Sequence, residues 1–91
     1  MKKGDIVTLV THVGEVIGRV QSDNLDSITL ENPRLFVNSD TGAGLAPGIC
    51  LTGIKDPNEG LFYKASVVAV VPTASELTKA WIQQTSGLVL Q

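Results

Sequence analysis

The segment from Phe62 to Pro72, FYKASVVAVVP, limits the possible folds of this chain more than any other. It contains five consecutive apolar residues, four of them valine, and ends at a proline. A β-branched run of this kind predicts a strand with little water on either face. Because a chain of 91 residues buries only about 60–65% of its unfolded surface, covering both faces alone is difficult. We expect one face to fill a small barrel and the other to meet a helix or a second copy of the chain.

The composition also favours association. Hydrophobic residues make up 43% of the chain, which is more apolar surface than so small a core needs, although a well-packed monomer is the alternative. The formal charge is −2, with seven basic residues in all, so the chain lacks the overall basic excess of a strong nucleic-acid binder. A ring could still concentrate one lysine per subunit around a pore.

The sequence lacks the residues that several classes of function require. Cys50 and His12 are the only cysteine and histidine, so we expect no disulfide, metal site or Cys–His pair within the chain. We find no nucleophile elbow or phosphate-binding loop, and we expect no catalytic residue and no cofactor. The start, MKKGD, precedes a strand rather than the apolar core of a signal peptide. No apolar run approaches the ~18–20 residues of a membrane span.

Alternation and turn residues predict one domain over 1–91, with strands between about 5 and 71. Gly18 is expected where the sheet bends hard or another backbone comes close, and Pro33 predicts a bulge or a sheet edge. Segment 38–48 is expected to be a loop or hairpin tip, and segment 55–60 a turn. The expected strands are 5–11, 15–21, 27–31 with a continuation at 35–37, 49–54 and 67–71.

A helical period begins after Pro72 and predicts a helix over 74–85. Thr73 and Glu76 have the spacing of a capping box. We expect one face of this helix to cover the open end of the barrel or a neighbouring subunit, and Gly87 to end it. The apolar tail at 88–91 is interpreted as docked rather than frayed. The helical face consists of Leu77, Ala80, Trp81 and Gln84.

Two segments resemble the Sm, Sm-like and Hfq family. In the first, VTHVGEVIGRV is similar to the family's strand–turn–strand pattern, with Gly18 at its mid-strand glycine. Asp23, followed by Ser27-Ile28-Thr29-Leu30, falls on the family's Asp-x-x-x-Asn and alternating aliphatics. In the second, Tyr63 to Pro72 lines up with the Tyr-Lys-His segment of Hfq and its closing Val-Val-Pro. The chain resembles in particular the small Sm-like proteins of cyanophage origin.

The resemblance implies a mainly β fold, namely a small, strongly bent, five-stranded antiparallel Sm-like barrel of the SH3 type, here with a C-terminal helix. It also implies a cyclic homo-oligomer of about five to seven subunits. In such a ring the fourth strand of one subunit pairs with the fifth strand of the next, which covers both strand edges. On this chain the subunit interface would contain Val67, Val68, Val70, Ile49 and Leu51.

The resemblance further implies single-stranded RNA binding on one face of the ring, in RNA metabolism or as an RNA chaperone. Asp23 and Ser27 would lie in one loop, Tyr63 would stack on a base, and Lys64 would meet phosphate or a base carbonyl. Without RNA, Asp23 and Ser27 are ordinary turn residues, Tyr63 is a core residue and Lys64 is a solvated charge. We expect a cytoplasmic protein, in the bacterial host cell if a phage encodes it.

Three positions depart from the family's RNA-contact residues. Leu25 replaces an aromatic residue or histidine, Ser27 replaces asparagine, and Ala65 replaces the histidine that follows Tyr-Lys. These departures and the acidic balance favour the alternative function. In that alternative the protein is a structural or protein-binding ring that has lost RNA affinity, with a role in the particle or in host takeover if a phage encodes it. The partners expected are therefore further copies of the chain, with either RNA or another protein.

Overall fold

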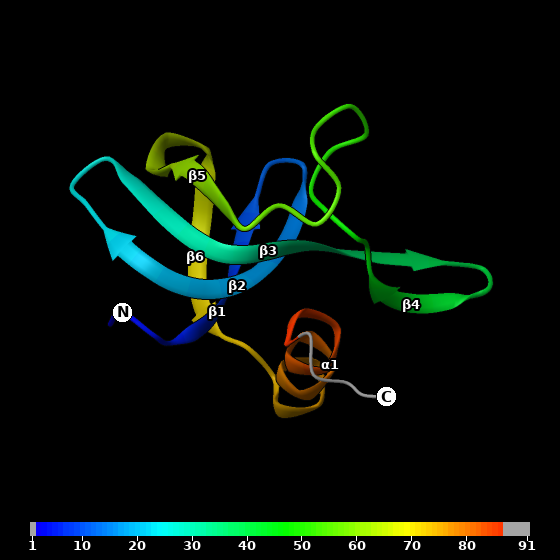
Figure 1. Cartoon of the computed structure of the whole chain (residues 1–91). Helices are drawn as coiled ribbons and strands as arrows, with labels where there is room; N and C mark the ends of the chain where they lie inside the picture. Colours follow the sequence, from blue (N-terminus) through cyan, green and yellow to red (C-terminus); the bar gives the residue numbers. More distant parts are fainter. Residues whose placement is uncertain (1, 87–91) are drawn as a thin grey trace.

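The fold is a curved antiparallel sheet of six strands followed by one helix (Figure 1). This computed structural model describes residues 2–86. In the sheet the order is β4-β3-β2-β1-β6, and β5 pairs with β3. The predicted class, mainly β with a C-terminal helix, is confirmed. The elements are β1 (Ile6–Thr11), β2 (Gly14–Asp23), β3 (Ser27–Ser39), β4 (Gly42–Leu45), β5 (Glu59–Tyr63), the 3₁₀ turn η1 (Lys64–Ser66), β6 (Val67–Pro72) and α1 (Ser75–Thr85).

The main core lies on the concave side of the three longest-paired strands, β1, β2 and β3. Alternate residues of each strand point to this side, as the period of two requires. Residues from β5, β6 and the loop after β4 pack against it, including Phe62, Ile49 and Val67. The buried cluster consists of Val7, Leu9, Val16, Val20, Ile28 and Leu30.

The sheet bends where β3 comes close to Gly18 of β2, and both expectations for this region are confirmed. A Cβ atom on Gly18 would lie 2.9 Å from the Cβ atom of Leu30 and 3.1 Å from the backbone oxygen of Glu31. The β2–β3 register shifts between Ile17, which pairs with Arg34, and Arg19, which pairs with Glu31. One more residue therefore lies on β3 than on β2 in this interval, which is the bulge predicted beside Pro33.

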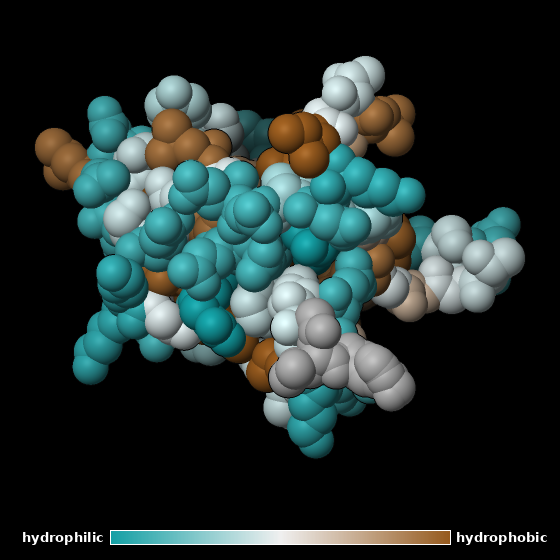
Figure 2. All heavy atoms as spheres, in the orientation of Figure 1, coloured by the Kyte–Doolittle hydropathy of each residue, from teal (hydrophilic) through white to brown (hydrophobic). Residues whose placement is uncertain are grey.

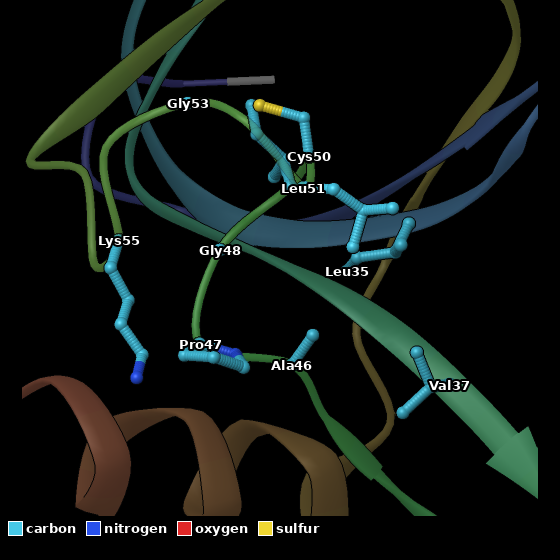
Figure 3. Close-up of a pocket in the computed structure, with 10 residues that line it drawn as sticks. Leu35, Val37, Ala46, Pro47, Gly48, Cys50, Leu51, Gly53 and Lys55 are labelled. Carbon is cyan, nitrogen blue, oxygen red and sulfur yellow. The ribbon is translucent and has the colours of Figure 1, made fainter.

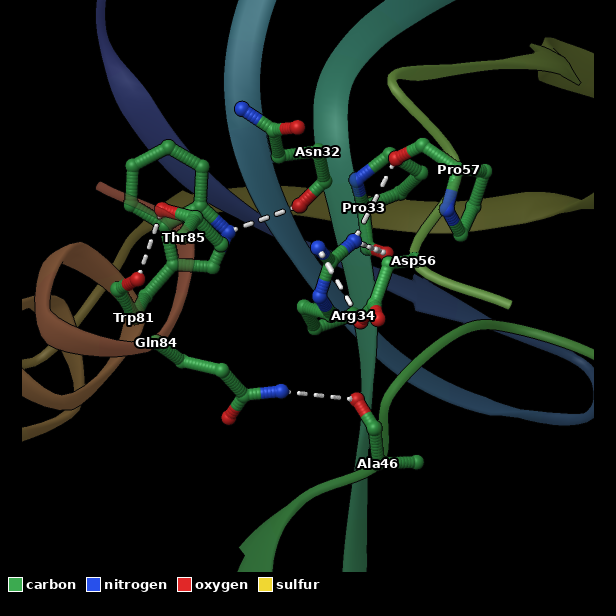
Figure 4. Close-up of polar contacts among 9 residues, drawn as sticks. All are labelled: Asn32, Pro33, Arg34, Ala46, Asp56, Pro57, Trp81, Gln84 and Thr85. Atoms are coloured by element: carbon green, nitrogen blue, oxygen red, sulfur yellow. Dashed lines mark hydrogen bonds and ion pairs between the residues drawn. The ribbon is translucent and has the colours of Figure 1, made fainter. Parts of the chain in front are cut away.

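The helix α1 covers the opposite face of the sheet, because its Trp81 packs on Arg19, which alternates along β2 with the core residue Val20. Figure 4 shows the polar contacts of this helix. Trp81 is fully buried, and its indole Nε1 donates to the backbone oxygen of Asn32 at 2.9 Å. The guanidinium of Arg19 lies 5.3 Å from the centre of the Trp81 ring. The predicted helix is thus confirmed to within one residue at its start. The predicted capping box is wrong, because Ala74 is the N-cap and the Thr73 hydroxyl instead bonds the Thr8 hydroxyl at 2.9 Å.

The sheet is not closed within the described chain. Strand β5 pairs with β3 and β6 pairs with β1, and these two strands do not pair with each other. The predicted strand at 67–71 is confirmed as β6, and η1 turns the chain between β5 and this strand. The prediction of five strands is wrong, because β3 runs on for 13 residues and its last part forms a hairpin with β4.

The predicted strand at 49–54 is wrong. This part of the chain belongs to an irregular loop between β4 and β5. Pro47 and Pro57 cannot donate to a ladder, and Asp56 has a φ of 53°, so the backbone leaves the extended region. Buried Arg34 holds the loop, since its Nη2 lies 3.6 Å from Asp56 Oδ1 and its Nη1 donates to the Pro57 oxygen at 3.4 Å. The strand that follows, β5, takes in the last two residues of the predicted turn at 55–60.

Strand β6 is shielded on one face only. Val67 and Val70 pack against the core, whereas Val68 is 64% exposed and Val71 43% exposed. Figure 2 shows apolar residues over β5 and over the loop after β4, whereas the front of β2 and β3 is mostly hydrophilic. No helix among residues 2–86 is both long and apolar enough to span a membrane. Gly87 and the apolar tail at 88–91 lie outside the described residues.

Candidate nucleic-acid interface

The structure brings together the four residues predicted to contact RNA, at the turn between β2 and β3. Tyr63, the last residue of β5, pairs across the ladder with Ser27, the first residue of β3. The backbone N–H of Lys64 donates to the Asp26 oxygen at 2.9 Å, which fixes η1 against the turn. Residues 36 or more positions apart in the sequence therefore share one corner of the sheet.

The ammonium of Lys64 is already engaged within this corner. Its Nζ atom donates to Asp23 Oδ1 at 2.5 Å and to the backbone oxygen of Asn24, also at 2.5 Å. The hydrogen bond from Lys64 lowers the pKa of the Asp23 carboxyl below its ordinary value. At neutral pH the pair is therefore an ion pair, and much of the positive charge of Lys64 is compensated locally. Asp23 positions the lysine and competes with any phosphate for it.

Tyr63 is the side chain of this corner that is most available to a flat ligand. It is 63% exposed, so the alternative that Tyr63 is a core residue is wrong. Leu25, at the tip of the same turn, is 97% exposed. Ser27, by contrast, is buried, so its hydroxyl offers little to a base approaching from outside. The corner can therefore supply an aromatic face for stacking and an ion pair, but few groups that could form hydrogen bonds with the edge of a base.

Sequence reasoning missed two groups in this corner, the backbone oxygens of Asn24 and Asp26. They hold the side chain and the backbone of Lys64, respectively. Side-chain patterns could not have identified them, because every residue carries a carbonyl and only the turn geometry selects these two.

The residues predicted for the subunit interface fall into two places. Val67, Val68 and Val70 lie on β6, whose outer edge is unpaired in the described chain. Ile49 and Leu51 lie in the loop after β4, where Ile49 packs on the core and Leu51 is fully exposed. The strands β4 and β5 also have one unpaired edge each in the described chain, and β5 carries the half-exposed Leu61.

A separate apolar groove opens beside this loop (Figure 3). Its volume is about 470 Å³, and its wall combines the end of β3 with the start of the loop. The exposed thiol of Cys50 lies in the wall, and Lys55 is its one charged residue. Within residues 2–86, no three His, Cys, Asp or Glu side chains are grouped so that they could hold a metal ion.

Compared with protein-family models and with curated proteins, the sequence matches none of them.

Proposed function

We propose that this protein is a ring-forming, Sm-like protein that binds single-stranded RNA, with Tyr63 as the stacking residue. The observation that carries the proposal is the convergence of exposed Tyr63 with the Lys64–Asp23 ion pair on one turn beside an unpaired strand edge. A ring would repeat this corner once per subunit. Stacking on successive aromatic rings tolerates any base sequence and suits a single strand.

The unpaired edges of β5 and β6 support the ring. Within the described chain, β5 and β6 each expose one side of their backbone ladder. Unpaired edges expose free N–H and C=O groups and invite pairing with another chain. Pairing β5 of one subunit with β6 of the next would occupy both edges and cover part of Val68 and Leu61. The contact is head-to-tail, so it closes into a ring when the rotation between subunits divides a full turn.

The RNA contact proposed for each subunit has two parts. The Tyr63 ring stacks on a base, and Lys64 meets a backbone phosphate after it leaves Asp23. Because Asp23 and phosphate compete for the same ammonium, Asp23 weakens RNA binding in this proposal. Replacing Asp23 with asparagine removes the competing charge but keeps a side chain of the same shape.

A second candidate function is a structural or protein-binding ring without RNA affinity. It is favoured by the ion pair at Lys64 and by the burial of Ser27, because both reduce what the corner offers to RNA. The ring and its unpaired edges are common to both candidates, so they do not discriminate between them. A direct measurement of RNA binding discriminates between the two candidates.

The first test is fluorescence anisotropy with labelled oligo-uridine and oligo-adenosine, at low and moderate salt. We expect saturable binding that weakens with salt. Tyr63→Ala should weaken it about 5- to 100-fold, since stacking contributes ~1–3 kcal/mol per base. Tyr63→Phe keeps the ring and should bind like the wild type.

Lysine and aspartate variants complete the test. Lys64→Ala should weaken binding and Asp23→Asn should strengthen it, whereas Lys79→Ala, on the exposed side of α1, should leave it unchanged. Absence of binding at low salt by a correctly folded wild type would reject RNA binding and leave the structural ring. Equal affinity of Tyr63→Ala and Tyr63→Phe would reject the stacking role even if RNA bound.

A further inference from the structure

We propose that the apolar groove beside the loop after β4 is the docking site for the chain's own segment 88–90. This proposal is independent of RNA binding and of the ring. It rests on three observations, namely the chemistry of the groove, the position of the last described turn of α1, and the sequence that follows that turn.

The groove is built to accept aliphatic side chains. Its volume of about 470 Å³ is within the ~300–1,000 Å³ of typical ligand pockets. Leu51 is fully exposed and Val37 is 44% exposed, so the wall presents apolar surface to water. Exposed apolar residues that line one groove indicate a surface that binds a partner or another segment of the chain. The wall includes Leu35, Val37, Ala46, Ile49, Cys50 and Leu51.

The end of α1 lies next to this wall. Gln84 Nε2 donates to the backbone oxygen of Ala46 at 3.2 Å, and Ala46 is itself a wall residue (Figure 4). In Figure 3, Ala46 and Pro47 lie nearer to the α1 ribbon than Cys50 and Leu51 do. The last turn of α1 is therefore in contact with one residue of the groove wall.

The sequence after the helix fits the groove in polarity and in length. Leu88, Val89 and Leu90 follow Gln84 by four to six positions. At ~3.3 Å per extended residue, Leu90 can lie up to ~13 Å from Ser86. Each leucine that is fully buried contributes ~1.5–3 kcal/mol. Attachment to α1 also gives the segment an effective concentration near the millimolar range, which favours it over a segment of another molecule.

Cys50 provides a direct test, because it is the only thiol in the chain and it lies in the wall of the groove. We would measure the rate at which a maleimide modifies Cys50 in the full chain and in Leu88→Asp/Leu90→Asp. Replacing the two leucines with aspartate should leave the groove uncovered and raise the rate of Cys50 modification about tenfold. A tenfold change corresponds to ~1.4 kcal/mol of docking free energy. The control is Gln83→Asp/Gln91→Asp, which adds the same two charges without removing leucine, and should react like the wild type.

A second experiment distinguishes docking in the same chain from docking between chains. Val89→Cys supplies one additional thiol, and mild oxidation should form a disulfide with Cys50. We expect a cross-linked product with the mass of a single chain, at a yield that does not depend on protein concentration. This cross-linking experiment still tests the proposal if far-UV circular dichroism shows that the aspartate variant does not fold.

Two results would overturn the proposal. One is a Cys50 modification rate in Leu88→Asp/Leu90→Asp within about twofold of the wild-type rate, with circular dichroism unchanged. The other is a cross-linked product that contains two chains, because the groove would then be occupied by a second copy. Failure of RNA binding would leave both experiments unaffected.

Discussion

At the scale of the residue, Gly18 shows how one missing side chain permits the bend of the sheet. Strand β3 approaches so closely that a Cβ atom at this position would lie 2.9 Å from the Leu30 Cβ atom. Both strands are fixed by ladders on each side, so neither can withdraw easily. Gly18→Ala should therefore lower the free energy of unfolding by ~1–3 kcal/mol, the usual result of overpacking. Urea denaturation followed by circular dichroism measures this change.

Gly44 is the matched control for this prediction. It also lies in a strand, its φ is not positive, and a Cβ atom there would meet nothing within 4 Å. Gly44→Ala should change the free energy of unfolding by less than ~1 kcal/mol, and reduced entropy of the unfolded chain could make the change favourable. If both alanine variants were equally stable, the close approach at Gly18 would have no energetic importance.

At the scale of the element, α1 depends on its contact with the sheet. A helix of 11 residues is marginal by itself in water, and this helix has no side-chain N-cap. Trp81 supplies its fully buried contact and the hydrogen bond to Asn32. Trp81→Ala should lower the free energy of unfolding by ~3–5 kcal/mol, which is much of the total for a domain of this size.

Two variants separate the parts of this contact, again by urea denaturation. Trp81→Phe keeps an apolar ring but removes the indole N–H, so it should have an intermediate effect. Ile82→Ala alters the next residue of α1, which is 43% exposed, and should have a small effect. A loss below ~1 kcal/mol in Trp81→Ala would show that the helix is held by other contacts.

At the scale of the whole molecule, the unpaired edges of β5 and β6 are the feature that predicts assembly. Val68 lies on β6 with 64% of its surface exposed. We expect the wild type to have a mass in solution several times the 9.6 kDa of one chain. Val68→Asp would place a charge in the proposed interface and should reduce the mass to that of one chain, because unpaired charges are expensive to bury. Light scattering at micromolar concentration measures both masses.

Val13 supplies the control for the assembly prediction. It lies in the turn between β1 and β2 and is 88% exposed, so Val13→Asp adds the same charge outside the strands β5 and β6. Its mass should equal that of the wild type. A wild type that is monomeric at micromolar concentration would remove the argument from the unpaired edges, and with it the ring.

Much of the fold could be predicted from the sequence because it depends on local rules. Alternation located β1, β2 and the start of β3, and the change of period after Pro72 located α1. Gly18 and Pro33 indicated the close approach and the bulge, since each residue limits the backbone wherever it occurs. The four candidate RNA contacts were also named from the sequence, and they share one corner.

Other features were decided by tertiary structure alone, because they depend on which distant groups meet. The apolar segment at 49–54 has the composition of a strand, yet its backbone is held as a loop by Arg34 and two prolines, and β5 takes the edge. Thr73 has the spacing of a cap, yet its hydroxyl bonds Thr8, which is 65 positions away. Lys64 reads as a free charge in the sequence, and only the fold places it on Asp23, because a turn and a strand end meet there.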